Sequence, residues 1–253
     1  MAQTWSGDGS HRLPAGRVEP YRLWFEFLKL AYRDPQISVA PDTYADWGDI
    51  ADQSFNIWWK AHWRQLFAVT STVTKLCAGA TVPSDDRSIT LHIPMTGSTD
   101  AILDQVSAFL AKEGVNLQEQ GRFGLSLGYD QGFIKQMDKA RRYLRLYGYW
   151  LKHAACDPRK RVERAARDYV SWYAKWEIKV RAGSKHRITP MPYFYKTFVG
   201  YLDQKSAKKQ GQGGQAAYGD GNAENARRQI VRDIRIARKI AENVTQGEFP
   251  GRY

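Results

Sequence analysis

Two long amphipathic helices, separated by a single break at Asp157-Pro158, constrain this chain more than any other feature of its sequence. Between residues 130 and 156, apolar side chains recur at steps of three and four. This spacing keeps them on one side of a helix, because each residue turns the chain by about 100°. The residues of this apolar side are Phe133, Met137, Ala140, Leu144, Tyr147 and Leu151. After the break the same spacing recurs in Val162, Ala166, Tyr169, Tyr173, Trp176 and Val180. We therefore expect a mainly α-helical protein in which each of these helices buries one face.

The other side of the second helix is basic. Its cations also recur at helical spacing and are Lys160, Arg164, Arg167, Lys175 and Lys179. The helix boundaries are marked by Asp157 as the N-cap, Pro158 in the first turn and Gly183 as the C-terminal cap. One face of this helix is predicted to be buried, and the other to meet negative charge.

The net charge of +12 is distributed unevenly along the 253 residues. Residues 1–127 contain 11 Lys and Arg against 14 Asp and Glu, whereas residues 128–253 contain 27 against 12. The first half therefore carries a net charge of −3 and the second half +15. Such an asymmetry predicts a polyanionic partner for the second half. The alternative is a solvated basic surface that only keeps the protein soluble.

The C-terminal segment predicts another amphipathic helix, from about Glu224 to Val244. Its apolar side contains Ile230, Ile234, Ala237, Ala241 and Val244. Its basic side contains Arg228, Arg232, Arg235 and Lys239. The preceding residues 205–223 are rich in glycine and lysine and show no periodicity, which predicts a flexible basic linker.

The N-terminal half predicts aromatic helices and a small β insert. Residues 20–33 are apolar on most sides, which is typical of a core helix, and a Trp-rich helix is expected to start near residue 52 or 54. Alternating residues around 89–93 and 115–127 flank a helix that starts at Ser98, so residues 87–127 predict a strand–helix–strand insert. The expected domains are an arm (1–17), an acidic aromatic domain (18–127), a basic helical domain (128–204), the linker (205–223) and a basic C-terminal helix and tail (224–253).

Several classes of function lack support in the sequence. Cys77 and Cys156 form no CxxC pair, so neither a disulfide framework nor a zinc site is indicated, and we expect no cofactor and no metal. Four carboxylates between Asp42 and Asp52 are more typical of a solvated turn than of a cation site. No apolar run reaches the ~20 residues of a membrane span, which predicts a cytoplasmic protein without a membrane partner.

One catalytic pattern has to be weighed. Asp168, Glu177 and Lys179 satisfy the loose D…ExK spacing of metal-dependent nucleases, in which two carboxylates hold Mg²⁺. That geometry requires Glu177 and Lys179 to lie side by side on a strand. On the helix predicted here, residues two apart diverge by roughly 200°, which argues against the nuclease.

The sequence therefore favours a nucleic-acid-binding protein, with DNA preferred over RNA, in a regulatory or architectural role. The predicted binding residues are the nine cations of the two basic helix sides, which would contact mainly the phosphate backbone. Aromatic residues interleaved with these cations would permit base stacking, although core packing is the commoner role at helical spacing. These residues are Tyr143, Tyr147, Tyr149, Trp150 and Trp172. The alternative is a structural subunit of a nucleoprotein complex, in which the acidic half docks the basic half of a neighbouring copy. A nuclease comes third, and no enzyme activity is expected.

Overall fold

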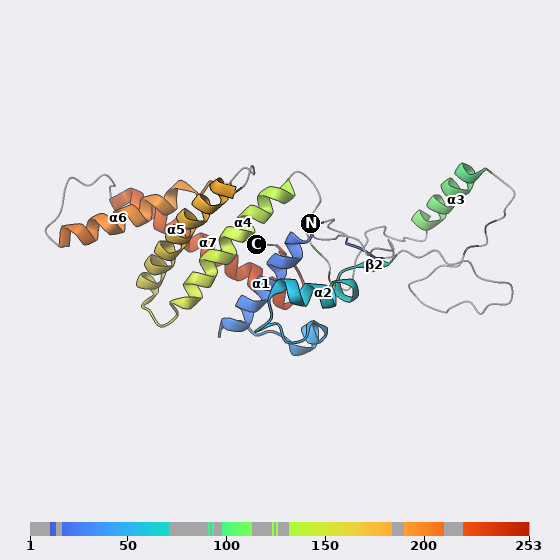
Figure 1. Ribbon diagram of the computed structural model, residues 1–253, viewed down its shortest axis with the longest axis horizontal. Coiled ribbons are helices and arrows are strands. Elements are labelled where there is room, and N and C mark those ends of the chain that lie inside the picture. Colours follow the sequence, from blue (N-terminus) through green and yellow to red (C-terminus); the bar gives the residue numbers. More distant parts are fainter. Residues whose placement is uncertain are drawn as a thin grey trace.

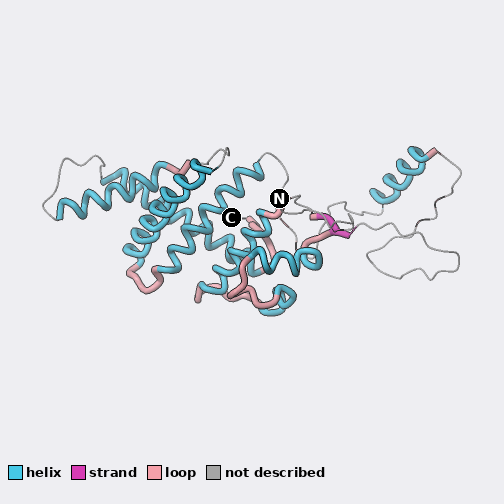
Figure 2. Tube along the Cα trace, viewed as in Figure 1, coloured by secondary structure: helices cyan, strands magenta, loops and turns pink. Residues whose placement is uncertain are grey.

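The computed structural model describes residues 11–13, 17–70, 91, 93, 98–112, 123, 125, 132–183, 190–209 and 220–252. These residues are mainly α-helical, as predicted (Figures 1 and 2). The helices are α1 (Glu19–Arg33), the 3-10 helix η1 (Pro41–Trp47), α2 (Phe55–Leu66), α3 (Thr99–Lys112), α4 (Gly132–Lys152), α5 (Pro158–Gly183), α6 (Tyr193–Lys209) and α7 (Asp220–Thr245). The two short strands β1 (His11–Arg12) and β2 (Val69–Thr70) pair antiparallel, with His11 opposite Thr70.

The break between the two central helices lies where the sequence predicts it. Asp157 Oδ1 accepts a hydrogen bond from the backbone N–H of Arg159 at 3.0 Å, which satisfies a donor that the first helical turn leaves unpaired. Pro158 is the first residue of α5, where its missing N–H costs nothing. Met137, Ala140 and Tyr147 of α4 and Val162, Ala166, Tyr169 and Tyr173 of α5 are buried, which confirms the predicted apolar faces at these positions.

Helices α4, α5, α6 and α7 form a four-helix bundle. In sequence order each packs on the next, and α7 closes the bundle against α4. Helices α5 and α7 contact each other more sparsely, because both are flanked by α4 and α6. They therefore occupy opposite corners of the bundle.

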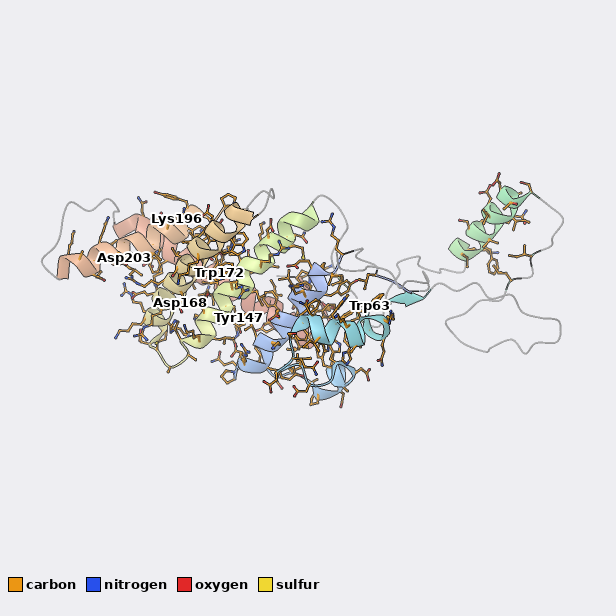
Figure 3. All side chains as sticks on the ribbon, viewed as in Figure 1. Trp63, Tyr147, Asp168, Trp172, Lys196 and Asp203 are labelled. Atoms are coloured by element: carbon orange, nitrogen blue, oxygen red, sulfur yellow. The ribbon has the colours of Figure 1, made fainter. Side chains whose placement is uncertain are left out.

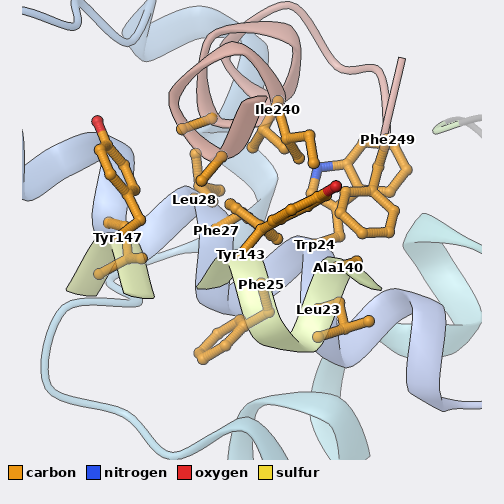
Figure 4. Close-up of a cluster of buried hydrophobic side chains, with 14 of the residues drawn as sticks. Leu23, Trp24, Phe25, Phe27, Leu28, Ala140, Tyr143, Tyr147, Ile240 and Phe249 are labelled. Atoms are coloured by element: carbon orange, nitrogen blue, oxygen red, sulfur yellow. The ribbon is translucent and has the colours of Figure 1, made fainter. Parts of the chain in front are cut away.

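An aromatic cluster forms the other part of the core. Helix α1 buries nearly its whole circumference, as expected for a core helix, although Tyr32 in its last turn is 53% exposed. Trp24 lies at the centre, with its ring centroid about 6 Å from those of Trp47, Phe67, Phe123 and Phe249. Figure 4 shows Phe249, close to the C-terminus, beside Trp24 in the same cluster as Ile240 of α7.

Helix α7 connects the bundle to the aromatic cluster. It packs against α6 and α4 of the bundle and also against α1 of the aromatic cluster. Tyr44 of η1 donates a hydrogen bond from its hydroxyl to the carbonyl of Val244 at the end of α7. A buried carboxylate, Asp34, at the end of α1 accepts a hydrogen bond from Tyr147 of α4 and lies 3.9 Å from Nε of Arg238 of α7. The C-terminal helix is therefore a central element of the core and not an appendage.

Parts of two segments that the sequence predicts to be flexible belong to helices or strands. Residues 205–209 belong to α6 and residues 220–223 to α7, so that only 210–219 of the predicted linker lie outside the described residues. Part of the predicted N-terminal arm is also ordered, since His11–Arg12 form β1 and Leu13 is 2% exposed.

The predicted strand–helix–strand insert is not supported. Its helix is present as α3, but Leu91 and Ile93 lie in no strand. Leu125 forms only an isolated bridge with Phe249. The other residues of the two predicted strands lie outside the described part of the chain. The alternating pattern was a weak signal, because short apolar runs do not distinguish strands from other buried segments.

Candidate nucleic-acid interface

The strongest candidate surface lies on α7. Its buried face contains Ile230, Ile234, Ala237 and Ala241, and this packing fixes the rotation of the helix. The opposite side carries four cations, here called the α7 stripe: Arg228, Arg232, Arg235 and Lys239. All four are exposed, as the helical spacing predicts.

The acidic residues that form ion pairs with the α7 stripe lie at its two ends, whereas Asp233, which follows Arg232, is buried inside the bundle. Arg228 Nε is 3.8 Å from Glu224, and Lys239 Nζ is 3.5 Å from Glu242. Arg232 and Arg235, in the middle, form no ion pair with any residue in the described part of the chain. Their guanidinium groups can therefore bind an external anion without first leaving a partner carboxylate.

A second group of cations lies on α5. The α5 stripe consists of Lys160, Arg164, Arg167, Lys175 and Lys179. Lys160, Arg164 and Lys175 are exposed, and the side chain of Lys179 lies outside the described part. Arg164 Nη1 donates a hydrogen bond to Sγ of Cys156 at 3.1 Å, which leaves its other donors available.

Arg167 differs from the rest of the α5 stripe. Its guanidinium forms an ion pair with Asp203 of α6, a residue that lies on the neighbouring helix in Figure 3. This pair joins α5 to α6, so Arg167 serves helix packing as well as surface charge. Sequence spacing did not indicate the pair, because the two residues are 36 positions apart.

The two stripes face in opposite directions. Each lies on the side of its helix that is turned away from the bundle core, and α5 and α7 occupy opposite corners of the bundle. A single straight duplex cannot contact both stripes at once. The sequence placed the nine cations on two helices but contained no information on how these helices are oriented relative to each other.

Aromatic and basic side chains also meet between α4 and α5, and this surface includes a cation that the sequence analysis missed. Arg145 of α4 lies over the ring of Trp172 of α5, with 5.1 Å between Cζ and the ring centroid. Trp172 is half-buried and stacks on Trp176 at an interplanar angle of 19°. Of the aromatic residues considered for base stacking, Tyr143 and Tyr147 are buried, whereas Tyr149, Trp150 and Trp172 remain partly exposed. In the sequence, Arg145 is distinguished only by its position next to the apolar face of its helix. Such a position does not by itself show what the cation contacts.

A charged network lies inside the bundle. Asp233 of α7 is 6% exposed, and its Oδ2 lies 3.2 Å from Nε of Arg142 and 2.7 Å from the hydroxyl of Tyr195, which donates a hydrogen bond to it. Burial raises the pKa of Asp233 above its ordinary value, although Arg142 and the Tyr195 hydrogen bond oppose this shift. Burial also raises the pKa of Tyr195 well above its ordinary value, and the negative charge of Asp233 adds to this shift.

The residues of the nuclease pattern do not form a metal site. Asp168 and Glu177 both lie on α5, where nine residues separate them by about 13 Å along the helix axis. Asp168 instead accepts hydrogen bonds from Lys152 Nζ at 3.0 Å and His153 Nε2 at 3.1 Å. Burial tends to raise the pKa of Asp168, but the hydrogen bonds from Lys152 and His153 and the charge of Lys152 outweigh it, and the pKa is lowered. The strand that this nuclease geometry requires is therefore absent at Glu177.

The other candidate ligands are also dispersed. Among the described residues, no three His, Cys, Asp or Glu side chains group closely enough to hold a metal ion. Asp49, one of the four carboxylates between Asp42 and Asp52, accepts a hydrogen bond from the backbone N–H of Ala51. His62 is half-buried and stacks on Trp58.

Comparison of the chain with models of protein families, with curated proteins and with solved structures found no match. In the described part of the chain, the helices are too short or too polar to cross a lipid bilayer.

Proposed function

We propose that this protein binds nucleic acid, with DNA as the preferred partner, in a regulatory or architectural role. The observation that carries the proposal is the α7 stripe. It presents four exposed cations on one side of a helix that is anchored in the core, and its two central arginines have no carboxylate partner among the described residues.

The chemistry of the α7 stripe favours phosphate contacts over base readout. Arg228 and Lys239 are 11 residues apart, so the stripe extends over about 16 Å of helix. Duplex DNA presents one charge per ~1.7 Å of axis, which places several phosphates within reach of these side chains. An arginine fork binds phosphate oxygens in a bidentate manner, and phosphate contacts position a protein without reading sequence.

The assembly alternative, in which the acidic half of one copy docks the basic half of another, receives no specific support from the described residues. Two acidic residues of the N-terminal half pair within the same chain instead. Glu19 Oε1 accepts a hydrogen bond from Arg141 Nε at 2.8 Å, and Asp34 pairs with Arg238. Part of the opposite charge of the two halves is therefore neutralised by ion pairs within the folded chain.

The test is a mobility-shift titration with duplex DNA, single-stranded DNA and RNA at several salt concentrations, with and without Mg²⁺. Removing Arg232 and Arg235 together as glutamines should weaken duplex binding about equally for all sequences. It should also reduce the slope of log affinity against log salt by about 0.9 for each lost phosphate contact. Helical content by circular dichroism should not change, because both side chains point away from the core.

A matched control removes two exposed cations outside both stripes, Arg33 and Lys60. This variant should bind with nearly the wild-type salt slope. An absence of binding by the wild type at low salt, or equal losses in the two variants, would contradict the proposed function. Mg²⁺-dependent cleavage of the substrate would instead support the nuclease.

A further inference from the structure

We infer that the protein is a bridge, which holds two duplex segments at once, one on the α7 stripe and one on the α5 stripe. This inference rests on the proposed function and adds a second, independent site to it. It also explains why the cations are divided between two helices that do not share a face.

The two stripes are oriented by the buried faces of their helices. Tyr169 of α5 and Ile230 of α7 both point into the bundle and are almost fully buried. The cations on both helices lie about 180° from these residues around the helix axis, because Arg167 and Arg228 are each two positions from them. Since α5 and α7 occupy opposite corners, the two cationic surfaces point away from each other.

The two stripes are also far apart. Adjacent helices in bundles lie 8–10 Å apart, so that diagonal axes and two extended arginine side chains place the charged groups on the order of 25 Å apart. This distance exceeds the Debye length of ~8 Å at physiological ionic strength about threefold. Each stripe therefore attracts phosphate largely independently, because dissolved salt screens the charges of two bound duplexes from each other.

Each stripe contains cations that form no ion pair with a described residue and can therefore bind the phosphates of a duplex. The α7 stripe has Arg232 and Arg235 without a described partner. On α5, Lys160 and Lys175 are exposed and form no ion pair with a described residue, and they are separated by about 22 Å of helix. The neighbouring Arg145, which stacks on Trp172, extends this cationic surface onto α4.

A two-duplex capture assay tests the inference. One biotinylated duplex is fixed on beads, and retention of a second, fluorescent duplex is measured at a salt concentration at which sedimentation shows a monomer. The α5-face variant carries Lys160→Gln, Arg164→Gln and Lys175→Gln. The α7-face variant carries Arg228→Gln, Arg232→Gln and Arg235→Gln. Arg167 is left intact in both because it pairs with Asp203.

The wild type should retain the second duplex. The amount retained by the α5-face variant, and by the α7-face variant, should be at least tenfold lower. Both variants should still shift one duplex in a gel, each through its remaining stripe. A variant that combines all six substitutions should lose the gel shift as well. A triple variant that removes Arg33, Lys60 and Lys112, which are exposed cations outside both stripes, should retain the second duplex like the wild type.

The failures of the two proposals are distinguishable. A wild type that shows no gel shift contradicts the proposed function, and bridging falls with it. A wild type that shifts a duplex but retains no second one contradicts bridging alone. A single-face variant that still retains the second duplex also overturns the two-site arrangement, because it shows that copies with one site each associate.

Discussion

Among single residues, Asp233 occupies an unusual position for a carboxylate. It lies in the interior of the four-helix bundle, where Arg142 of α4 and Tyr195 of α6 are its partners. Two charges removed from water gain back in mutual attraction roughly what they lose in hydration, so such a pair contributes little net stability. It does penalise any arrangement of α4, α6 and α7 that separates the partners.

This position yields a stability prediction. Arg142→Met leaves Asp233 buried without its counter-charge and should lower the free energy of unfolding by about 3 kcal/mol at neutral pH. The combined variant Arg142→Met, Asp233→Leu and Tyr195→Phe should be close to the wild type, because no buried polar group is left unpaired. Denaturant unfolding measures both.

The pH dependence of this loss follows from the raised pKa of Asp233. A carboxyl group whose folded-state pKa is raised favours the fold at low pH, and this contribution is lost as the pH rises through the folded-state pKa. Without Arg142 the pKa of Asp233 should rise further. The deficit of Arg142→Met relative to the wild type should therefore shrink as the pH is lowered towards 4. A deficit that grows on acidification would contradict this account.

At the scale of elements, the segment after α7 is part of the core. Gly247 and Gly251 have φ angles of 79° and 71°, which favour glycine, and they turn the chain back along α7. Asn243 Nδ2 donates hydrogen bonds to the carbonyl oxygens of Pro250 and Arg252. These contacts place the fully buried ring of Phe249 next to Trp24 of α1.

We expect Phe249→Ala to lower the free energy of unfolding by about 3–5 kcal/mol, because it removes a buried aromatic ring from a packed cluster. The melting temperature should fall by roughly 2–4 °C per kcal/mol for a chain of this size. Arg252→Ala is the control, since this exposed side chain should contribute less than about 0.5 kcal/mol. Similar melting temperatures for the two variants would show that the tail does not stabilise the core.

At the scale of the whole molecule, charge serves two purposes. Some acidic residues of the N-terminal half pair with cations of the C-terminal half inside one chain, as Glu19 does with Arg141. Other carboxylates, including Asp42 and Asp52, are exposed on and after η1. The cations of the two stripes lie on opposite faces of the bundle, and further exposed cations lie on α4 and α6, among them Lys139, Lys152 and Lys196.

The exposed charges predict weak self-association at low ionic strength, through contact of the acidic surface of one copy with a basic stripe of another. Sedimentation velocity at tens of micromolar protein should show association at low salt and a monomer at moderate salt. Asp42→Asn combined with Asp52→Asn should weaken the association. A monomer under both conditions would contradict the prediction and leave the charge asymmetry to folding and to external partners.

The sequence alone determined the local structure of most of the described chain. The periodicity of α4, α5 and α7, the N-cap at Asp157, the exposed side of α7 and the exposure of Lys160, Arg164 and Lys175 on α5 were predicted correctly. These features depend on residues within a few turns of one another. The predicted β insert was not supported, since short alternating runs are ambiguous without a partner strand. Only the tertiary structure showed that α7 is central, that Arg167 pairs with Asp203 and that Phe249 fills the aromatic cluster. It also decided that the two stripes face apart. These features depend on contacts between residues far apart in the chain, and helical periodicity defines which side of a helix is polar but not where that side points in the folded molecule.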